Sequence, residues 1–194
     1  MSRVAAVVAA GLLLAALTAS PAEAAAVSIV NYAFSPQVIS TPQGSTVTWT
    51  NDGSVTHTST QNGPLAYWNT GNIASGSSDS ATIRAAGVYA YHCNIHPSLM
   101  TGKVKVPILV SPSSGTTATI FTLTLASSTA AGYVYDVQQK IGDGAWTAWM
   151  TGVATRTVTF DPSAAGTYRF RSRLRRTSDG AKTGYSPAKK ITVT

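Results

Sequence analysis

The sequence predicts an all-β protein, and three observations lead to that prediction. Short runs of alternating apolar and polar residues, rich in valine, threonine and tyrosine, recur between turn residues, as in 45–50 and 87–91. Glycine and small hydroxyl residues are abundant, and long runs with a helical period are absent from the sequence. Many short strands separated by such turns are typical of β-sandwiches.

The first 24 residues are predicted to be a signal peptide. Arg3 precedes an apolar stretch, 4–17, and Ala22-Glu23-Ala24 has the small-x-small pattern of a cleavage site. The stretch is shorter than the ~20 residues of a spanning helix, although an uncleaved membrane anchor is the alternative. No cysteine stands at the cleavage site, which argues against a lipid anchor. We therefore expect a secreted or otherwise extracytoplasmic protein whose mature chain has no transmembrane anchor.

The remainder is predicted to form two domains, 25–110 and 118–194. The segment 111–117 begins Ser-Pro-Ser-Ser-Gly, a loop composition that indicates a linker. Charge also separates the two halves, because residues 25–110 carry a formal charge of +1 and residues 111–194 a charge of +6. The basic excess therefore belongs to the second predicted domain.

Cys93 is the only cysteine of the chain and lies in Tyr-His-Cys-Asn-Ile-His-Pro-Ser-Leu-Met, residues 91–100. An exported protein with one cysteine cannot form an internal disulfide, so the alternatives are a buried structural thiol and a metal ligand. One thiolate, two imidazoles and a weak axial thioether suit copper in a blue, electron-transfer site. The loop supplies Cys93, His96 and Met100, and His57 can supply the second imidazole.

The order of the predicted strands supports this site. A strand at 46–51 runs into the loop that carries His57, a strand at 87–91 ends at Cys93, and a third at 103–106 follows the ligand loop. With the motifs Phe-Ser-Pro at 34–36, Gly-Ser-Thr-Val-Thr-Trp-Thr-Asn at 44–51 and Met-Thr-Gly-Lys-Val at 100–104, residues 26–110 resemble the cupredoxins, specifically the plastocyanin- and amicyanin-like blue copper proteins. The resemblance implies a Greek-key β-sandwich.

The resemblance also implies the roles of the ligands. His57, Cys93 and His96 would be the trigonal ligands of one type 1 copper ion, and Met100 the axial one. His96, beside Pro97 and Leu99, would be the edge at which a redox partner docks. Two departures stand out: three residues separate His96 from Met100, where amicyanin-like loops have two and plastocyanin-like loops four, and Thr58 occupies a position where many relatives have asparagine. The first departure leaves open whether Met100 is a true axial ligand.

Other aromatic residues and the third histidine are predicted to lie outside the site. His92 adjoins Cys93 on a strand, so its side chain should point to the opposite face. Trp49 and Tyr89 are expected to be core residues rather than an electron relay.

The second half resembles a fibronectin type III domain, an immunoglobulin-like β-sandwich, over about 117–194. Tyr168 stands where the tyrosine corner of such domains is expected. Alternation along 168–175 places one set of residues inside and four arginines outside: Arg169, Arg171, Arg173 and Arg175. These arginines form either a solvated outer face or a stripe that holds an acidic protein, an anionic wall polymer or a membrane surface. Nucleic acid is not an expected partner of an exported protein.

The predicted function is single-electron transfer between redox partners by a secreted, mononuclear blue copper protein that is not an enzyme. Copper oxidases and nitrite reductases need further copper sites, whereas this chain has three histidines and no His-x-His pair. Two alternatives use the same ligands: extracytoplasmic copper storage or delivery, and a cell-surface binding module with incidental copper.

Overall fold

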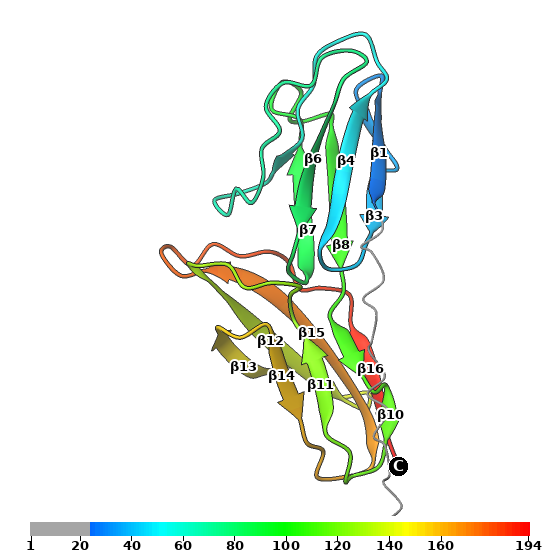
Figure 1. The fold of residues 1–194 in the computed structure, drawn as a ribbon, viewed down its shortest axis with the longest axis vertical. Coiled ribbons are helices and arrows are strands. Elements are labelled where there is room, and N and C mark those ends of the chain that lie inside the picture. The colour runs from blue at the N-terminus through cyan, green and yellow to red at the C-terminus, as the bar shows by residue number, and fades with distance from the viewer. Residues whose placement is uncertain (1–23) are drawn as a thin grey trace, which may run out of the picture.

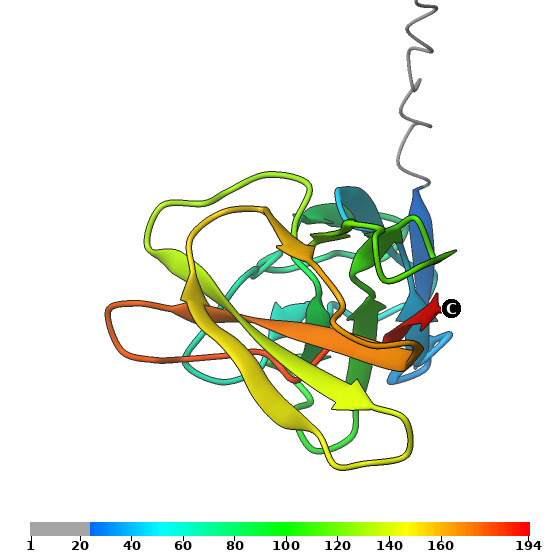
Figure 2. The same ribbon diagram turned by 90° about the horizontal axis from the view of Figure 1, so that it is seen from below.

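The computed structural model describes residues 24–194, and every regular element in them is a β-strand. The strands form two sandwiches stacked end to end (Figure 1), so that in the view along the long axis the second lies in front of the first (Figure 2). The all-β prediction is confirmed. The predicted signal peptide lies outside the described residues except for Ala24, and no helix in the described part is long and apolar enough to cross a membrane.

The first sandwich contains the predicted metal-binding motifs. Its two four-stranded sheets have the orders β2-β1-β4-β6 and β3-β8-β7-β5. Parallel pairing of β1 with β4 and of β3 with β8 makes both sheets mixed. Their strands are β1 (Ala25–Val30), β2 (Ala33–Ser35), β3 (Val38–Ser40), β4 (Ser45–Asn51), β5 (Thr60–Gln61), β6 (Ser78–Ile83), β7 (Gly87–His92) and β8 (Thr101–Val106).

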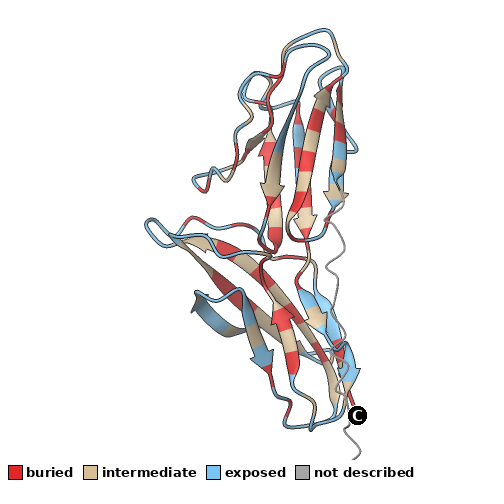
Figure 3. Cartoon of the chain, viewed as in Figure 1, coloured by how far each residue is buried: buried red, intermediate tan, exposed pale blue. Residues whose placement is uncertain are grey.

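Alternation along β4 and β7 builds the core between these sheets. In both strands every second residue is buried and the others are half-buried (Figure 3), because successive side chains of a strand point to opposite faces. Trp49 of β4 and Tyr89 of β7 are fully buried, so they are core residues, as predicted. Cys93 and Met100 belong to the same buried cluster, and the ligand loop therefore begins and ends in the core.

The second sandwich pairs a three-stranded sheet with a five-stranded one. Their orders are β14-β11-β9 and β10-β16-β15-β12-β13. The strands are β9 (Leu109–Ser111), β10 (Ser114–Gly115), β11 (Phe121–Thr124), β12 (Tyr133–Ile141), β13 (Thr147–Val153), β14 (Thr157–Phe160), β15 (Gly166–Arg176) and β16 (Lys189–Val193).

The segment 111–117, predicted to be a linker, contributes Ser111, Ser114 and Gly115 to strands of the second sandwich. β9 pairs with β11, from Leu109 to Ser111, and β10 pairs in parallel with β16. The loop-forming composition misled the prediction, because serine and glycine at a sheet edge can pair their backbone groups like any other residues. The chain therefore passes from one sandwich to the other near Pro107, without a free linker.

The two sandwiches share buried residues at their junction. Leu65, Ala85 and Ala86 of the first sandwich belong to the core cluster of the second. Arg176 of β15 donates hydrogen bonds to the carbonyl oxygens of Leu65, at 3.2 Å, and Pro64, at 2.5 Å. Backbone hydrogen bonds also join Val88 of β7 to Gly184 in both directions, at 2.9 and 3.0 Å. These contacts fix one sandwich against the other.

The predicted alternation along β15 is confirmed. Tyr168, Phe170, Ser172 and Leu174 are buried, and the arginines between them are half-buried on the outer face. Arg173 and Arg175 share one carboxylate within the chain, since both form ion pairs with Asp136 at 3.1 Å. The outer face is therefore not one uniform positive stripe.

Candidate metal centre

Backbone hydrogen bonds fold the ligand loop tightly after β7. The amide of Cys93 donates to the carbonyl of Met100 at 3.1 Å, which closes the loop at the point where β8 begins. The amide of His96 donates to the Cys93 carbonyl at 3.2 Å, and the amide of Met100 donates to the His96 carbonyl at 3.0 Å. The loop thus brings the Cys93 and His96 side chains to one side through its own backbone contacts.

His57 reaches the same place from the loop that follows β4. Its backbone exchanges two hydrogen bonds with Ile73, of 3.1 and 2.7 Å. The amide nitrogen of the Asn51 side chain donates to the carbonyls of Val55, at 2.8 Å, and Ile73, at 2.9 Å. Asn51 is completely buried and therefore ties the loop before His57 to the segment that holds His57. Its positioning role was missed from the sequence, where it was only part of a motif.

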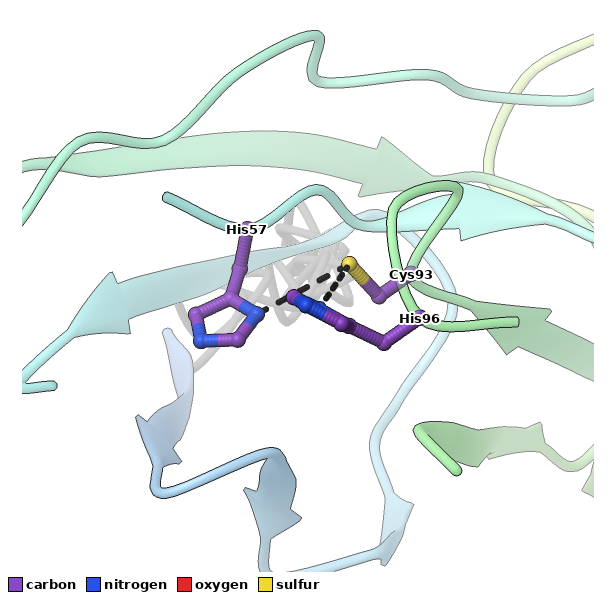
Figure 4. Close-up of side chains that lie close together, drawn as sticks. All are labelled: His57, Cys93 and His96. Carbon is purple, nitrogen blue, oxygen red and sulfur yellow. Dashed lines mark hydrogen bonds between the residues drawn. The ribbon is translucent and has the colours of Figure 1, made fainter. Parts of the chain in front are cut away.

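The three side chains converge with their ligand atoms facing one another (Figure 4). The Cys93 Sγ lies 3.8 Å from the Nδ1 of His57 and 3.8 Å from the Nδ1 of His96. All three ligand atoms lie within 4.8 Å of one another. Typical metal–nitrogen and metal–sulfur bonds of about 2.0 and 2.3 Å, set at a trigonal angle, separate nitrogen from sulfur by about 3.7 Å. The arrangement therefore fits a metal ion in the plane of one thiolate and two imidazoles.

The surroundings of His57 favour the form in which it binds a metal. Cys93 and His57 are fully buried and His96 is half-buried. Burial, and then the charge of His96, lower the pKa of His57, which favours the neutral imidazole that binds metals. The backbone amide of Thr58 donates to the Cys93 Sγ at 3.3 Å, a contact that stabilises negative charge on sulfur.

Comparison with known proteins identifies the family of the first sandwich. The model of the cupredoxin-like domain matches residues 3–106, just over half of the 194 residues. The chain belongs to the cupredoxin-like family. Cupredoxins bind copper and are generally electron carriers rather than enzymes. None of the curated proteins matches this chain.

Solved structures of cupredoxins also resemble it. A purple cupredoxin from Nitrosopumilus maritimus shares 32% sequence identity, with 42% of this chain and 98% of that chain covered and a TM-score of 0.40. A reduced copper(I) form of an amicyanin variant shares 29% identity, with 47% and 87% of the two chains covered and a TM-score of 0.40.

Thr58 takes part in the site although it departs from the asparagine of many cupredoxins. Its backbone amide contacts the thiolate, and its Oγ1 accepts a hydrogen bond of 2.8 Å from the amide of Asn94. Asn94 directly follows Cys93. The hydroxyl therefore joins the two ligand-bearing loops of this cupredoxin.

Met100 is fully buried at the end of the ligand loop. The three residues between His96 and Met100 form a turn, closed by hydrogen bonds from the amides of Leu99 and Met100 to the His96 carbonyl. The turn lies at the surface, where Leu99 is 70% exposed. The unusual number of residues between His96 and Met100 is therefore accommodated outside the core. Met100 itself shares a buried cluster with the Cys93 ligand.

Tyr32 covers the site and was not foreseen from the sequence. Its ring stands edge-on to the rings of His57 and His96, with centroid distances of 5.7 and 4.8 Å. Tyr32 and Asn31 form the two-residue turn between β1 and β2, and their φ angles are 66° and 45°. A tight hairpin with two positive φ angles favours asparagine and glycine, so Asn31 was a usable signal for the turn, although not for the ring contact.

His92 lies away from the ligands, as predicted. Its Nδ1 is hydrogen-bonded to the side-chain oxygen of Asn62 at 2.5 Å. In β7 the buried positions are 87, 89 and 91, whereas His92 is half-buried on the other face. The third histidine of the chain therefore takes no part in the converging group.

Proposed function

We propose that this cupredoxin binds one copper ion in a type 1 site and transfers single electrons between redox partners. The observation that carries the proposal is the facing arrangement of the Cys93 Sγ and the Nδ1 atoms of His57 and His96, at 3.8 Å. Met100 is proposed as the weak axial ligand on the strength of its burial and of its place in the same buried cluster as Cys93. Bound copper supplies one-electron chemistry, since it cycles between copper(II) and copper(I).

The protein's own contribution is to hold its ligands still. Asn51 and Ile73 fix His57, the Thr58 hydroxyl ties the two loops, and β7 and β8 anchor the ends of the ligand loop. A site whose ligands do not move when the charge changes keeps the reorganisation of electron transfer small. Cys93 and His57 are shielded from solvent, which excludes water from the centre.

We propose that the redox partner docks at the edge of His96. This half-buried ring is flanked by exposed apolar side chains, of which Leu99 is 70% and Ile95 46% exposed. A small apolar rim lets two proteins approach without trapping water between their redox centres. The chain has three histidines, and the one outside the converging group, His92, is bonded to Asn62; this favours a carrier over an enzyme with further copper sites.

We propose further that the protein acts outside the cytoplasm and that the second sandwich is fibronectin type III-like. The sequence pattern of the first 24 residues supports export. The Tyr168 hydroxyl donates a 2.8 Å hydrogen bond to the carbonyl of Ala164, four residues upstream, which supports the tyrosine corner. The second sandwich would then serve attachment or spacing.

A copper(II) titration of the metal-free protein tests the function. We expect an intense blue band that saturates at one copper per chain and bleaches reversibly with ascorbate. Cys93→Ser should abolish the band in a folded protein, whereas His92→Gln, a matched change one residue away, should leave it intact. A band that persists in the Cys93 variant would refute the ligand assignment. Tight copper binding without colour or reversible bleaching would favour storage or delivery.

A further inference from the structure

Three cations lie side by side on the outer face of the second sandwich. The strand register places Arg169 of β15 opposite Lys190 of β16 and opposite Lys140 of β12. Residues paired in this way share a face, and like charges directly opposite one another are destabilising. Because neighbouring strands are about 4.8 Å apart, the three side chains leave the sheet within about 10 Å. We call Lys140, Arg169 and Lys190 the basic row.

In the part of the chain that the structure describes, no acidic side chain forms an ion pair with the basic row. All the ion pairs among residues 24–194 lie elsewhere on the chain: Arg173–Asp136, Arg175–Asp136 and Arg176–Asp179. Arg169 donates instead to a neutral acceptor, the carbonyl of Gly142, at 2.9 Å. Asp136 thus offsets part of the charge at one end of the arginine face, while the basic row at the other end has no ion-pair partner within the described residues.

Arg171 adds to this charge beside the row. Its guanidinium stacks on the rings of Trp146, at 4.2 Å, and Tyr185, at 4.9 Å, and donates to Gln138 at 2.7 and 2.9 Å. None of these partners is acidic. The stacking also holds the planar guanidinium group in one orientation.

The basic row lies far from the metal centre. β15 runs from Gly166, near the row, to Arg176, which contacts the first sandwich. The ligand loop follows the other end of β7, whose first residue, Gly87, meets Thr183 of the second sandwich. The two sandwiches are stacked along this direction (Figure 1). A redox protein bound to the row would be separated from the ligands by both sandwiches, so the row is not the electron-transfer interface.

The surroundings of the row favour a hydrated polymer as its partner. The outward neighbours given by the register are Gln138, Thr167 and Thr192, which are polar. The exposed Ile141, next to Lys140, is paired with the buried Tyr168 and so belongs to the opposite face of the sheet. Guanidinium groups bind carboxylates with two parallel hydrogen bonds. We propose that the basic row binds an acidic polysaccharide, whose repeated carboxylates offset the repulsion among its three cations.

Calorimetric titration with polygalacturonate, on the metal-free protein, tests this proposal. We expect binding that weakens as salt is added. The variant Lys140→Gln, Arg169→Gln, Lys190→Gln should bind on the order of a hundredfold more weakly, from roughly fivefold for each cation near an anionic surface. A matched control, Arg84→Gln, Lys103→Gln, Lys105→Gln, removes the same residue types and charge from the first sandwich and should retain the wild-type affinity.

Three results would overturn the proposal. They are no binding of polygalacturonate by the wild type, an equal loss of affinity in both triple variants, and binding to phosphatidylglycerol vesicles that depends on the row while binding to the polymer does not. Far-UV circular dichroism checks that the variants are folded. If the triple variant fails to fold, Lys190→Gln alone, at an exposed position of β16, should weaken binding about fivefold.

Discussion

The ring of Tyr32 stands edge-on to the ring of His96, with their centroids 4.8 Å apart and an interplanar angle of 85°. The tyrosine occupies a left-handed backbone position, with φ of 66°, which costs about 1–2 kcal/mol for a residue with a side chain. Strained positions of this kind persist where the surrounding structure holds them, and they cluster at functional sites. The turn thus keeps an aromatic cover over the one ligand that is half-exposed.

Tyr32→Gly is expected to release copper faster to a chelator, because it removes the cover from both histidine rings. The free energy of unfolding of the metal-free protein should change by less than about 1 kcal/mol, since glycine relieves the left-handed backbone while the ring contacts are lost. Decay of the blue colour after addition of a chelator measures the release. Asn31→Gly, in the same turn but without a ring, is the control, and an equal rate in both variants would contradict the role of Tyr32.

Thr58→Val should loosen the link between the two ligand-bearing loops. Valine has nearly the shape of threonine but cannot accept the hydrogen bond from the Asn94 amide, so the free energy of unfolding should fall by about 1 kcal/mol. Urea unfolding of the metal-free protein measures this loss. Thr46→Val, which removes a hydroxyl paired with Thr82 on the sheet surface, should cost less; the opposite order would argue against the linking role.

Met100→Leu should preserve the blue colour and raise the reduction potential. The thioether donates electron density that favours copper(II), and the axial ligand is one of the features that tune the potential of blue copper sites. Leucine fills a similar volume, so the fold should lose less than about 1.5 kcal/mol. Voltammetry of the two proteins checks the potential. An unchanged potential would indicate that Met100 is packed in the core without acting as a ligand.

Asp136→Asn should remove an acid-sensitive part of the stability. Burial alone would raise the pKa of Asp136, but hydrogen bonds from Arg175, the Gly152 amide and Arg173 outweigh it and lower the pKa. A carboxylate with a lowered folded-state pKa contributes stability above its unfolded value of about 3.9, and this contribution is lost as the pH falls through that value toward the folded one.

The free energy of unfolding of Asp136→Asn should therefore be lower than that of the wild type by about 1–2 kcal/mol at neutral pH. This range allows for the partial exposure of the arginines. This difference in the free energy of unfolding should shrink toward zero as the pH falls below the pKa of the folded-state carboxyl. Urea unfolding across the pH range measures it. Asp143→Asn is a matched control, because Asp143 is exposed and forms no ion pair within residues 24–194. A difference that does not vary with pH would show that the Asp136 carboxylate is not the cause.

Leu65→Ala should destabilise both sandwiches together, because Leu65 is 1% exposed within the core of the second one. Truncation of a buried leucine costs about 2–5 kcal/mol. Leu109→Ala, at a position that is 47% exposed, should change the free energy of unfolding by no more than about 0.5 kcal/mol. Thermal unfolding followed by tryptophan fluorescence measures both variants. Equal midpoints for the two would mean that the shared core adds no stability.

The approach of Cys93 and His96 could be predicted from the sequence because the two residues lie in one short loop. Cys93, His96 and Met100 lie within eight consecutive residues. In the strand before each ligand-bearing loop, the alternation of residue types shows which side chains face the core. The same rule correctly placed His92 on the opposite face of β7 and the arginines on the outer face of β15. The alternation of residue types and the spacing of residues were sufficient to predict the position of a side chain wherever that position depends on a single strand or loop.

What could not be predicted depends on pairing between distant segments. Tyr32 and His96 are far apart in the sequence but in contact in the structure. Nothing in the Asn31-Tyr32 pair indicates that the tyrosine ring approaches a histidine. The segment 111–117 looked like a linker because its pairing with β11 and β16 is decided by sheet edges far away in sequence. Similarly, the arginine stripe looked uniform until the register brought Asp136 opposite Arg173.

The contact of Arg176 with Leu65 spans 111 residues, and this has a consequence for the order of biogenesis. A chain that emerges from its N-terminus first presents every proposed copper ligand long before β15 exists. Before β15 is synthesised, the core of the second sandwich in which Leu65 packs is incomplete. The segment between His57 and Trp68 then also lacks its hydrogen bond from Arg176. Domains generally fold as units during synthesis, but here the last third of the polypeptide completes the scaffold of the first. Metal loading should accordingly follow completion of the whole chain.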